Sequence, residues 1–161
     1  MVQKRQRRRA AIAVIQNRDW SNVNNSMNIP WKELRASARR ITEMSYAPYS
    51  RVTVGAAGIT CDGRTVEGTN IENASYGLTV CAECSLVSDL VRIGGGRLAA
   101  VSIVAGDGEP MAPCGRCRQL LFEHGGGELL IDGGEGKPLL TLSQLLPDAF
   151  GPDDLGSRRN A

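Results

Sequence analysis

The first part of the chain has apolar residues at helical spacing, followed by two stretches with the composition of strands. A helix is predicted to start near Asn28, with Pro30 in its first turn. The stripe that would face the core consists of Trp31, Leu34, Ala38 and Ile41. Residues 52–60 and 65–70 have a strand-like pattern, and the Asp-Gly pair at 62–63 is typical of a turn between strands. A helix followed by a hairpin is therefore expected.

The next part contains an approximate internal repeat of a Cys-x-x-Cys motif, an apolar helix, a glycine triplet and an apolar strand. The two copies span residues 81–105 and 114–132. The triplets at 94–96 and 125–127 follow the helices instead of preceding them, so we interpret them as helix ends and turns, not as phosphate loops. Two such units are expected side by side on one face of a sheet, with both helix N-termini at the same end. Both cysteine pairs should then converge.

A last strand near residues 137–140 and a short helix from Ser143 complete the pattern. The expected fold class is α/β, a three-layer sandwich around a mixed sheet of about five strands. A chain of 161 residues suits one domain. We place this domain at residues 29–155, followed by a flexible tail at 156–161. Because 42% of the residues are apolar and only 4% aromatic, the core should consist mainly of aliphatic side chains and alanine.

The charges are unevenly distributed, because a basic segment precedes the predicted domain. Its charged side chains are Lys4, Arg5, Arg7, Arg8, Arg9 and Arg18, against Asp19 alone. Since the whole chain has a net charge of +2, the predicted domain is slightly acidic, which argues against a nucleic-acid-binding surface. The apolar stretch after the basic run has about 6 residues, fewer than the roughly 7 to 15 of a secretory signal. We expect a disordered extension at residues 1–28 of a cytoplasmic protein that does not bind membranes.

The cysteines indicate a metal site. They are Cys61, Cys81, Cys84, Cys114 and Cys117. In a reducing compartment, two Cys-x-x-Cys pairs suggest metal before disulfide. Thiols at helix N-termini are favoured as thiolates, which zinc binds at about 2.3 Å. On spacing alone, a closed structural site with four cysteine ligands remains open.

Two further residues favour a catalytic site. Glu83 follows Cys81 by two positions, and Pro113 precedes Cys114, which gives Cys-x-Glu and then Pro-Cys-x-x-Cys. This is the three-cysteine form of a deaminase signature, with three ligands, an open position for water and a glutamate that is not a ligand. In a regular helix Glu83 would point about 200° away from Cys81. The arrangement therefore requires Cys81 to lie at the helix cap.

Together these motifs resemble the small homotetrameric zinc-dependent cytidine deaminases. The segments that carry the resemblance are 50–51, 54–57, 70–74, 81–83, 113–119 and 145–147. They occur in order from about residue 29 to residue 155, and their joint occurrence is more specific than any one of them. The resemblance implies hydrolytic deamination of free cytidine and 2′-deoxycytidine to uridine and 2′-deoxyuridine, with release of ammonia, in pyrimidine salvage.

The resemblance also implies roles for individual residues. One zinc ion per chain would be bound by Cys81, Cys114 and Cys117, and Glu83 would be the general acid and base. The expected nucleoside-binding residues are Asn70 and Glu72 for the ribose hydroxyls, with Val52, Ala82 and Phe150. In the homotetramer implied by the resemblance, Phe150 would reach the nucleoside of a neighbouring subunit. Without the resemblance, a polar pair such as Asn70 and Glu72 at a strand end would be interpreted as solvated.

The chain departs from the family pattern at two positions. Cys84 stands where many relatives carry an arginine, which revives the question of a fourth cysteine ligand. Val52 stands where a phenylalanine commonly packs on the pyrimidine. Since three thiolates leave a zinc centre with charge −1, a nearby cation is expected, and Arg118 is the candidate. His124 and Cys61 are predicted not to be ligands.

Three other functions compete with this one. An aminonucleoside-antibiotic deaminase of the same fold need not hold a free ribose, and Asn70 and Glu72 argue against it. A polynucleotide cytosine deaminase needs a basic channel and aromatic platforms, which this composition disfavours. The third is a noncatalytic zinc-stabilised binding module with a four-cysteine site.

Overall fold

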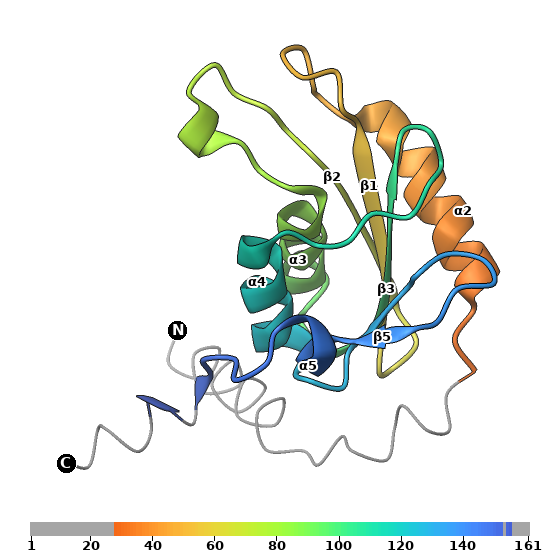
Figure 1. Ribbon diagram of the computed structural model, residues 1–161, viewed down its shortest axis with the longest axis vertical. Helices are drawn as coiled ribbons and strands as arrows, with labels where there is room; N and C mark the ends of the chain where they lie inside the picture. The colour runs from red at the N-terminus through yellow and green to blue at the C-terminus, as the bar shows by residue number, and fades with distance from the viewer. Residues whose placement is uncertain (1–27, 153, 156–161) are drawn as a thin grey trace, which may run out of the picture.

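The computed structural model describes residues 28–152, 154 and 155 (Figure 1). The predicted basic extension, apart from Asn28, and the predicted tail at 156–161 lie outside the described residues. Helix α2 (Trp31–Ile41) begins directly after Pro30, which occupies the N-cap position. Leu34 and Ala38 on its predicted stripe are buried. The amphipathic pattern was therefore sufficient to predict this helix.

A hairpin follows the short 3-10 helix η1 (Thr42–Met44). Strands β1 (Val54–Thr60) and β2 (Thr65–Thr69) pair antiparallel, with Gly63 in the turn at φ 86°. Strand β1 begins two residues later than predicted from sequence. There the backbone N–H of Val54 donates to the Asn70 side chain (2.8 Å), so a side chain takes the place of a strand partner.

The remaining elements include the helices and strands of the two repeat copies. They are η2 (Tyr76–Leu78), α3 (Ala82–Arg92), β3 (Leu98–Ala105), α4 (Gly115–Gly125), β4 (Leu130–Ile131), β5 (Leu140–Thr141) and α5 (Leu142–Leu145). As predicted, the glycine triplets follow α3 and α4, and Gly94, Gly95, Gly96 and Gly126 have positive φ. Positive φ is open to glycine without the penalty that a side chain would add.

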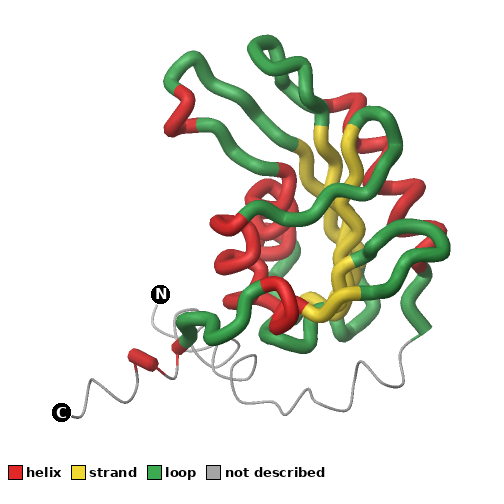
Figure 2. Tube along the Cα trace, in the orientation of Figure 1, coloured by secondary structure: helices red, strands yellow, loops and turns green. Residues whose placement is uncertain are grey.

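The five strands form one mixed sheet in the order β2-β1-β3-β4-β5. Only β3 and β4, the strands of the two repeat copies, pair parallel. Helix α2 covers one face of the sheet, while α3 and α4 lie side by side on the other (Figures 1 and 2). The predicted three-layer α/β sandwich is thus confirmed.

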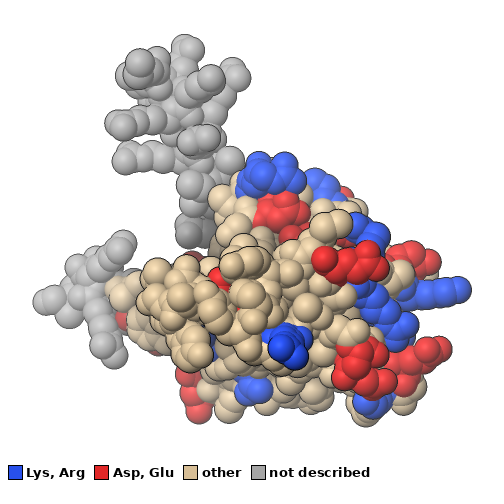
Figure 3. All heavy atoms as spheres, turned by 90° about the horizontal axis from the view of Figure 1, so that it is seen from above, with Lys and Arg blue, Asp and Glu red and all other residues tan. Residues whose placement is uncertain are grey.

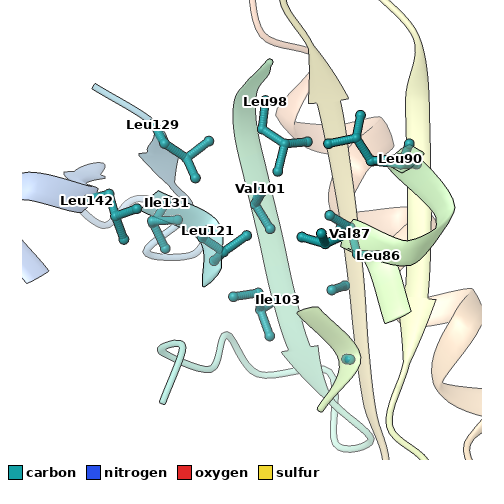
Figure 4. Close-up of a cluster of buried hydrophobic side chains, with 13 residues drawn as sticks. Leu86, Val87, Leu90, Leu98, Val101, Ile103, Leu121, Leu129, Ile131 and Leu142 are labelled. Atoms are coloured by element: carbon teal, nitrogen blue, oxygen red, sulfur yellow. The ribbon is translucent and has the colours of Figure 1, made fainter. Parts of the chain in front are cut away.

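Each face of the sheet has its own hydrophobic core. The core beneath α3 and α4 is the larger and is mainly aliphatic, with Leu86, Leu90, Val101, Ile103 and Leu121 among its buried side chains (Figure 4). The core beneath α2 is built from smaller side chains, including Ala38, Ala57, Ala99 and Ala100. The composition predicted this character, because the chain has few aromatic residues to bury.

Helix α3 approaches the edge strand β2 closely at Gly68. A β-carbon at this position would lie 2.2 Å from the backbone nitrogen of Leu86 and 2.3 Å from the carbonyl oxygen of Ala82. Both distances are far below van der Waals contact, so only glycine allows the first turns of α3 to pack here. The Ser85 hydroxyl adds a hydrogen bond to the Thr69 carbonyl (2.8 Å). These contacts fix the end of α3 from which the functional residues project.

Candidate metal centre

Two of the cysteines cap helices. Cys81 is the N-cap of α3 (φ −72°, ψ 157°) and Cys114 is the N-cap of α4 (φ −66°, ψ 166°), both with extended backbone. Cys81 therefore meets the geometric requirement that its spacing from Glu83 imposed. Cys117 lies in the first turn of α4 and is fully buried. Since α3 and α4 pack side by side, their N-terminal ends bring the cysteines of both repeat copies together.

The sulfur atoms of Cys81, Cys114 and Cys117 all lie within 4.8 Å of one another, and those of Cys81 and Cys114 are 4.0 Å apart. Tetrahedral zinc with bonds of about 2.3 Å separates its sulfur ligands by about 3.8 Å. The cluster therefore fits a zinc ion with little adjustment. Cys84 is not a member of this cluster, the only one of its kind in the described part of the chain. The geometry supports three cysteine ligands, not four.

Burial disfavours the thiolate form of these cysteines, although hydrogen bonds outweigh it at Cys114. Burial raises the pKa of Cys117, and the negative charge of Glu83 raises it further. Burial likewise raises the pKa of Cys81. At Cys114 burial acts in the same direction, but hydrogen bonds from the backbone and the side chain of Cys117 outweigh it, so the pKa falls. A divalent cation would offset the desolvation of all three, which is the chemistry expected of a zinc site.

Glu83 lies beside the cluster without being one of its members. Its side chain is in the first turn of α3 and only 4% exposed. Burial raises the pKa of its carboxyl group, and a hydrogen bond from the Cys117 thiol opposes that rise. A carboxyl group with a raised pKa binds a proton more readily than a solvated one, as a group that transfers protons requires. Its position thus suits proton transfer at the metal.

Arg118 has structural partners that the sequence did not reveal. Its guanidinium donates to the carbonyl of Pro113 (2.9 Å) and to that of Leu145 (2.8 Å). The side chain therefore holds the loop before Cys114 against the end of α5. Its positive charge stays next to the loop that carries a ligand, but its role in offsetting the thiolate charge remains a prediction.

Asn70 and Glu72 follow the edge strand β2 and are connected to the metal centre through the backbone. Between them, Ile71 exchanges two backbone hydrogen bonds with Val80 (2.9 and 2.8 Å), the residue before Cys81. The segment that carries both polar residues therefore lies beside the start of α3. Asn70 is buried and uses its amide to accept from Val54 and to donate to the Val52 carbonyl (2.9 Å).

The other predicted nucleoside-binding residues have different surroundings. Val52 is 49% exposed, so its side chain leaves open space. Ala82 is fully buried in the first turn of α3. Phe150 is exposed, and its carbonyl accepts a hydrogen bond from Gln119 (2.8 Å) in the middle of α4. The hydrogen bonds thus join Val52 to Asn70, while Phe150 is tied to a different part of the chain.

Two residues that were predicted not to be ligands stay apart from the cysteine cluster. His124 lies in the last turn of α4, where burial lowers its pKa. Cys61 follows β1, and burial raises the pKa of its thiol. Sequence reasoning missed Ser50, whose hydroxyl donates to Glu72. Ser50 lies in one of the matched motifs, but the pattern gave no sign of its partner.

The loops at this end of the molecule expose apolar side chains. They include Met44, Tyr46, Tyr49, Val52, Ile71, Tyr76 and Leu78. Figure 3 looks down on this end and shows a broad area of mainly uncharged residues, with scattered Lys, Arg, Asp and Glu side chains in and around it. The rings of Tyr49 and Tyr76 meet edge to face, with centroids 6.4 Å apart. Within the described residues, no helix has the length and apolar character needed to span a membrane.

The chain is similar to cytidine deaminases both in sequence and in structure. Residues 31–131 match the family model described as the cytidine and deoxycytidylate deaminase zinc-binding region. A cytidine deaminase of Mycobacterium tuberculosis is 53% identical over 134 residues, which cover 82% of this chain and 98% of that protein. A cytidine deaminase of Halalkalibacterium halodurans is 40% identical over 116 residues, covering 70% and 88% respectively. The crystal structure of the M. tuberculosis cytidine deaminase matches with a TM-score of 0.74, covering 77% of this chain and 99% of that chain.

The three-cysteine geometry predicts different effects for two similar substitutions. Cys84→Ser should retain one zinc ion per chain, because a catalytic site uses three protein ligands. Cys81→Ser should lose zinc or fail to fold. Metal analysis of the purified variants measures both. Equal loss of zinc in the two variants would instead favour a closed four-cysteine site.

Proposed function

The chain belongs to the zinc-binding cytidine and deoxycytidylate deaminase family, and we propose that it hydrolyses free cytidine and 2′-deoxycytidine to the corresponding uridines, with release of ammonia. It is accordingly a zinc-dependent hydrolytic deaminase, and pyrimidine salvage is the pathway that fits this reaction. One observation carries the assignment of its residues: three cysteine sulfurs converge within 4.8 Å, and a buried glutamate lies beside them that is not one of the group. A purely structural zinc site has no use for that glutamate.

The residue roles follow from this arrangement. Cys81, Cys114 and Cys117 would hold a zinc ion, which would supply a nucleophile by lowering the pKa of a water molecule. Glu83 would accept a proton as water adds to C4 of the cytosine ring, and would deliver that proton to N3. Glu83 then carries the second proton to the amino nitrogen, which leaves as ammonia when the C4–N bond breaks. One water is consumed for each ammonia released.

Nucleoside binding is assigned to the loops beside the metal centre. We assign Asn70 and Glu72 to the ribose hydroxyls, Val52 to the base, and Ala82 to the position next to the reacting ring. The support is positional, because the Ile71–Val80 backbone pair brings this segment to the start of α3. An antibiotic deaminase without a ribose site has less support, because Asn70 and Glu72 are present for a ribose. A polynucleotide deaminase with a basic channel has less support, because the basic side chains on the face in Figure 3 are scattered among acidic and uncharged ones.

We also propose a homotetramer in which Phe150 completes the site of a neighbouring subunit. Exposed apolar side chains around the nucleoside loops support an interface there. Phe150 is itself 52% exposed, so it is available to another chain. Sedimentation equilibrium should give the mass of four chains of 17.2 kDa. A monomer with full activity would contradict this proposal. Since the zinc site needs three reduced thiols, we place the enzyme in the cytoplasm.

The first test is the ultraviolet absorbance change on incubation with free cytidine, 2′-deoxycytidine, cytosine and single-stranded DNA. Both nucleosides should be converted, whereas the base and the DNA should not. Glu83→Gln should retain zinc and nucleoside binding but lose turnover, because the substitution preserves the shape and removes the proton carrier. Turnover by this variant, or conversion of DNA alone, would contradict the proposal.

The open space at Val52 predicts an effect on substrate affinity. Val52→Phe should lower the KM for cytidine about 5-fold or more and change kcat much less, because base stacking on an aromatic ring helps ground state and transition state alike. Val52→Leu is the matched control, since it adds volume without a ring. An unchanged or higher KM for the phenylalanine variant would show that the site does not lack an aromatic platform.

A further inference from the structure

Glu72 has most of its hydrogen-bonding capacity occupied within its own chain. Its Oε2 accepts from the backbone N–H groups of Tyr49 (2.9 Å) and Ser50 (3.2 Å). Its Oε1 accepts from the Ser50 hydroxyl. Since each carboxylate oxygen can accept about two hydrogen bonds, only Oε1 has a position left. A hydroxyl group of a ligand would therefore bind at Oε1, the oxygen that Ser50 holds.

The Ser50 hydroxyl has two partners that fix its orientation. It donates its one proton to Glu72 and accepts from the backbone N–H of Val52 (3.0 Å). Because the pKa of Glu72 is lowered, chiefly by the hydrogen bond from Ser50, the carboxylate remains ionised and is a strong acceptor. One hydroxyl thus joins the residue assigned to the ribose with the residue assigned to the base.

The backbone around Ser50 is held in an unusual conformation. Arg51, between Ser50 and Val52, has φ 61°, in a region that residues other than glycine seldom occupy. Further backbone contacts support the loop, since Glu72 N–H donates to the Tyr46 carbonyl (2.7 Å) and Tyr46 N–H to the Asn70 carbonyl (3.2 Å). The loop at 46–52 and the segment at 70–72 therefore form one hydrogen-bonded unit.

We propose that Ser50 is a positioning residue for nucleoside recognition. It aims Oε1 of Glu72 at a ribose hydroxyl, and the hydrogen bond that it accepts from the Val52 N–H holds its own hydroxyl in the orientation that this requires. This inference rests on the proposed function, in which Glu72 binds the ribose. The hydrogen bonds of the Ser50 hydroxyl are with Glu72 and Val52 and not with Glu83 or the three-cysteine cluster.

The test compares zinc-loaded full-length variants on cytidine and on 2′,3′-dideoxycytidine, which lacks the 2′- and 3′-hydroxyl groups and keeps only the 5′-hydroxyl. Ser50→Ala should lower kcat/KM for cytidine about tenfold, mainly through KM, because the hydrogen bond that it removes is to a charged group. The same variant should lower kcat/KM for dideoxycytidine by much less. Normal turnover of dideoxycytidine also shows that the variant is folded. Ser50→Thr keeps the hydroxyl and should restore the preference for cytidine.

Glu72→Gln distinguishes the positioning role of Ser50 from the proposed ribose-binding role of Glu72. When Ser50→Ala is added to the Glu72→Gln variant, it should cause no further loss of the cytidine preference, because the two residues act as one unit. If Ser50→Ala lowers kcat/KM equally for both substrates while Glu72→Gln still lowers the preference for cytidine, the positioning role of Ser50 is overturned. The proposed deamination of cytidine is then unaffected. If Glu72→Gln also leaves the preference unchanged, the ribose assignment of Glu72 itself is wrong.

Discussion

The placement of the functional residues depends on the contact between β2 and the first turns of α3. At Gly68 the strand backbone meets the helix backbone with no space for a side chain, since a β-carbon would lie 2.2 Å from the nitrogen of Leu86. The helix that starts at Cys81 is therefore fixed on the strand that leads into Asn70 and Glu72. Close-packed backbone does not shift gradually, so this approach, together with the Ile71–Val80 backbone pair, constrains the distance between the cysteine cluster and the segment to which we assign ribose binding.

The second half of the metal centre depends on the topology of the sheet. Parallel pairing of β3 with β4 places α4 next to α3 with the same orientation, and the shared core beneath them includes Leu86 and Leu121. Cys81 thus comes from one repeat copy, and Cys114 and Cys117 from the other. Because both helices present their N-terminal ends to the cluster, unpaired backbone N–H groups and the helix dipoles favour thiolates there. A bound zinc ion would join the two copies and stabilise the fold that forms its site.

Much of this could be predicted from sequence, because it follows from local pattern. The stripe of α2 and the two Cys-x-x-Cys repeats identified the helices, and the spacing of Cys81 and Glu83 required the cap that α3 has. What could not be predicted depends on long-range side-chain contacts. The late start of β1 results from Asn70, and the clamp made by Arg118 joins residues 27 positions apart. Neither leaves a periodic signal in the chain.

The structure divides chemistry and recognition between two kinds of environment. Glu83 and Cys117 are buried at helix ends that a packed core holds in place, so the reacting groups need little reorganisation. Ser50 and Val52 instead lie in an exposed loop, where substitutions leave the core undisturbed. The departure at Val52 falls in this loop, whereas Cys84, the other departure, lies on α3 outside the three-sulfur cluster. Under the proposed assignment, substrate preference can therefore change at the loop without any change in Glu83 or in the three cysteines.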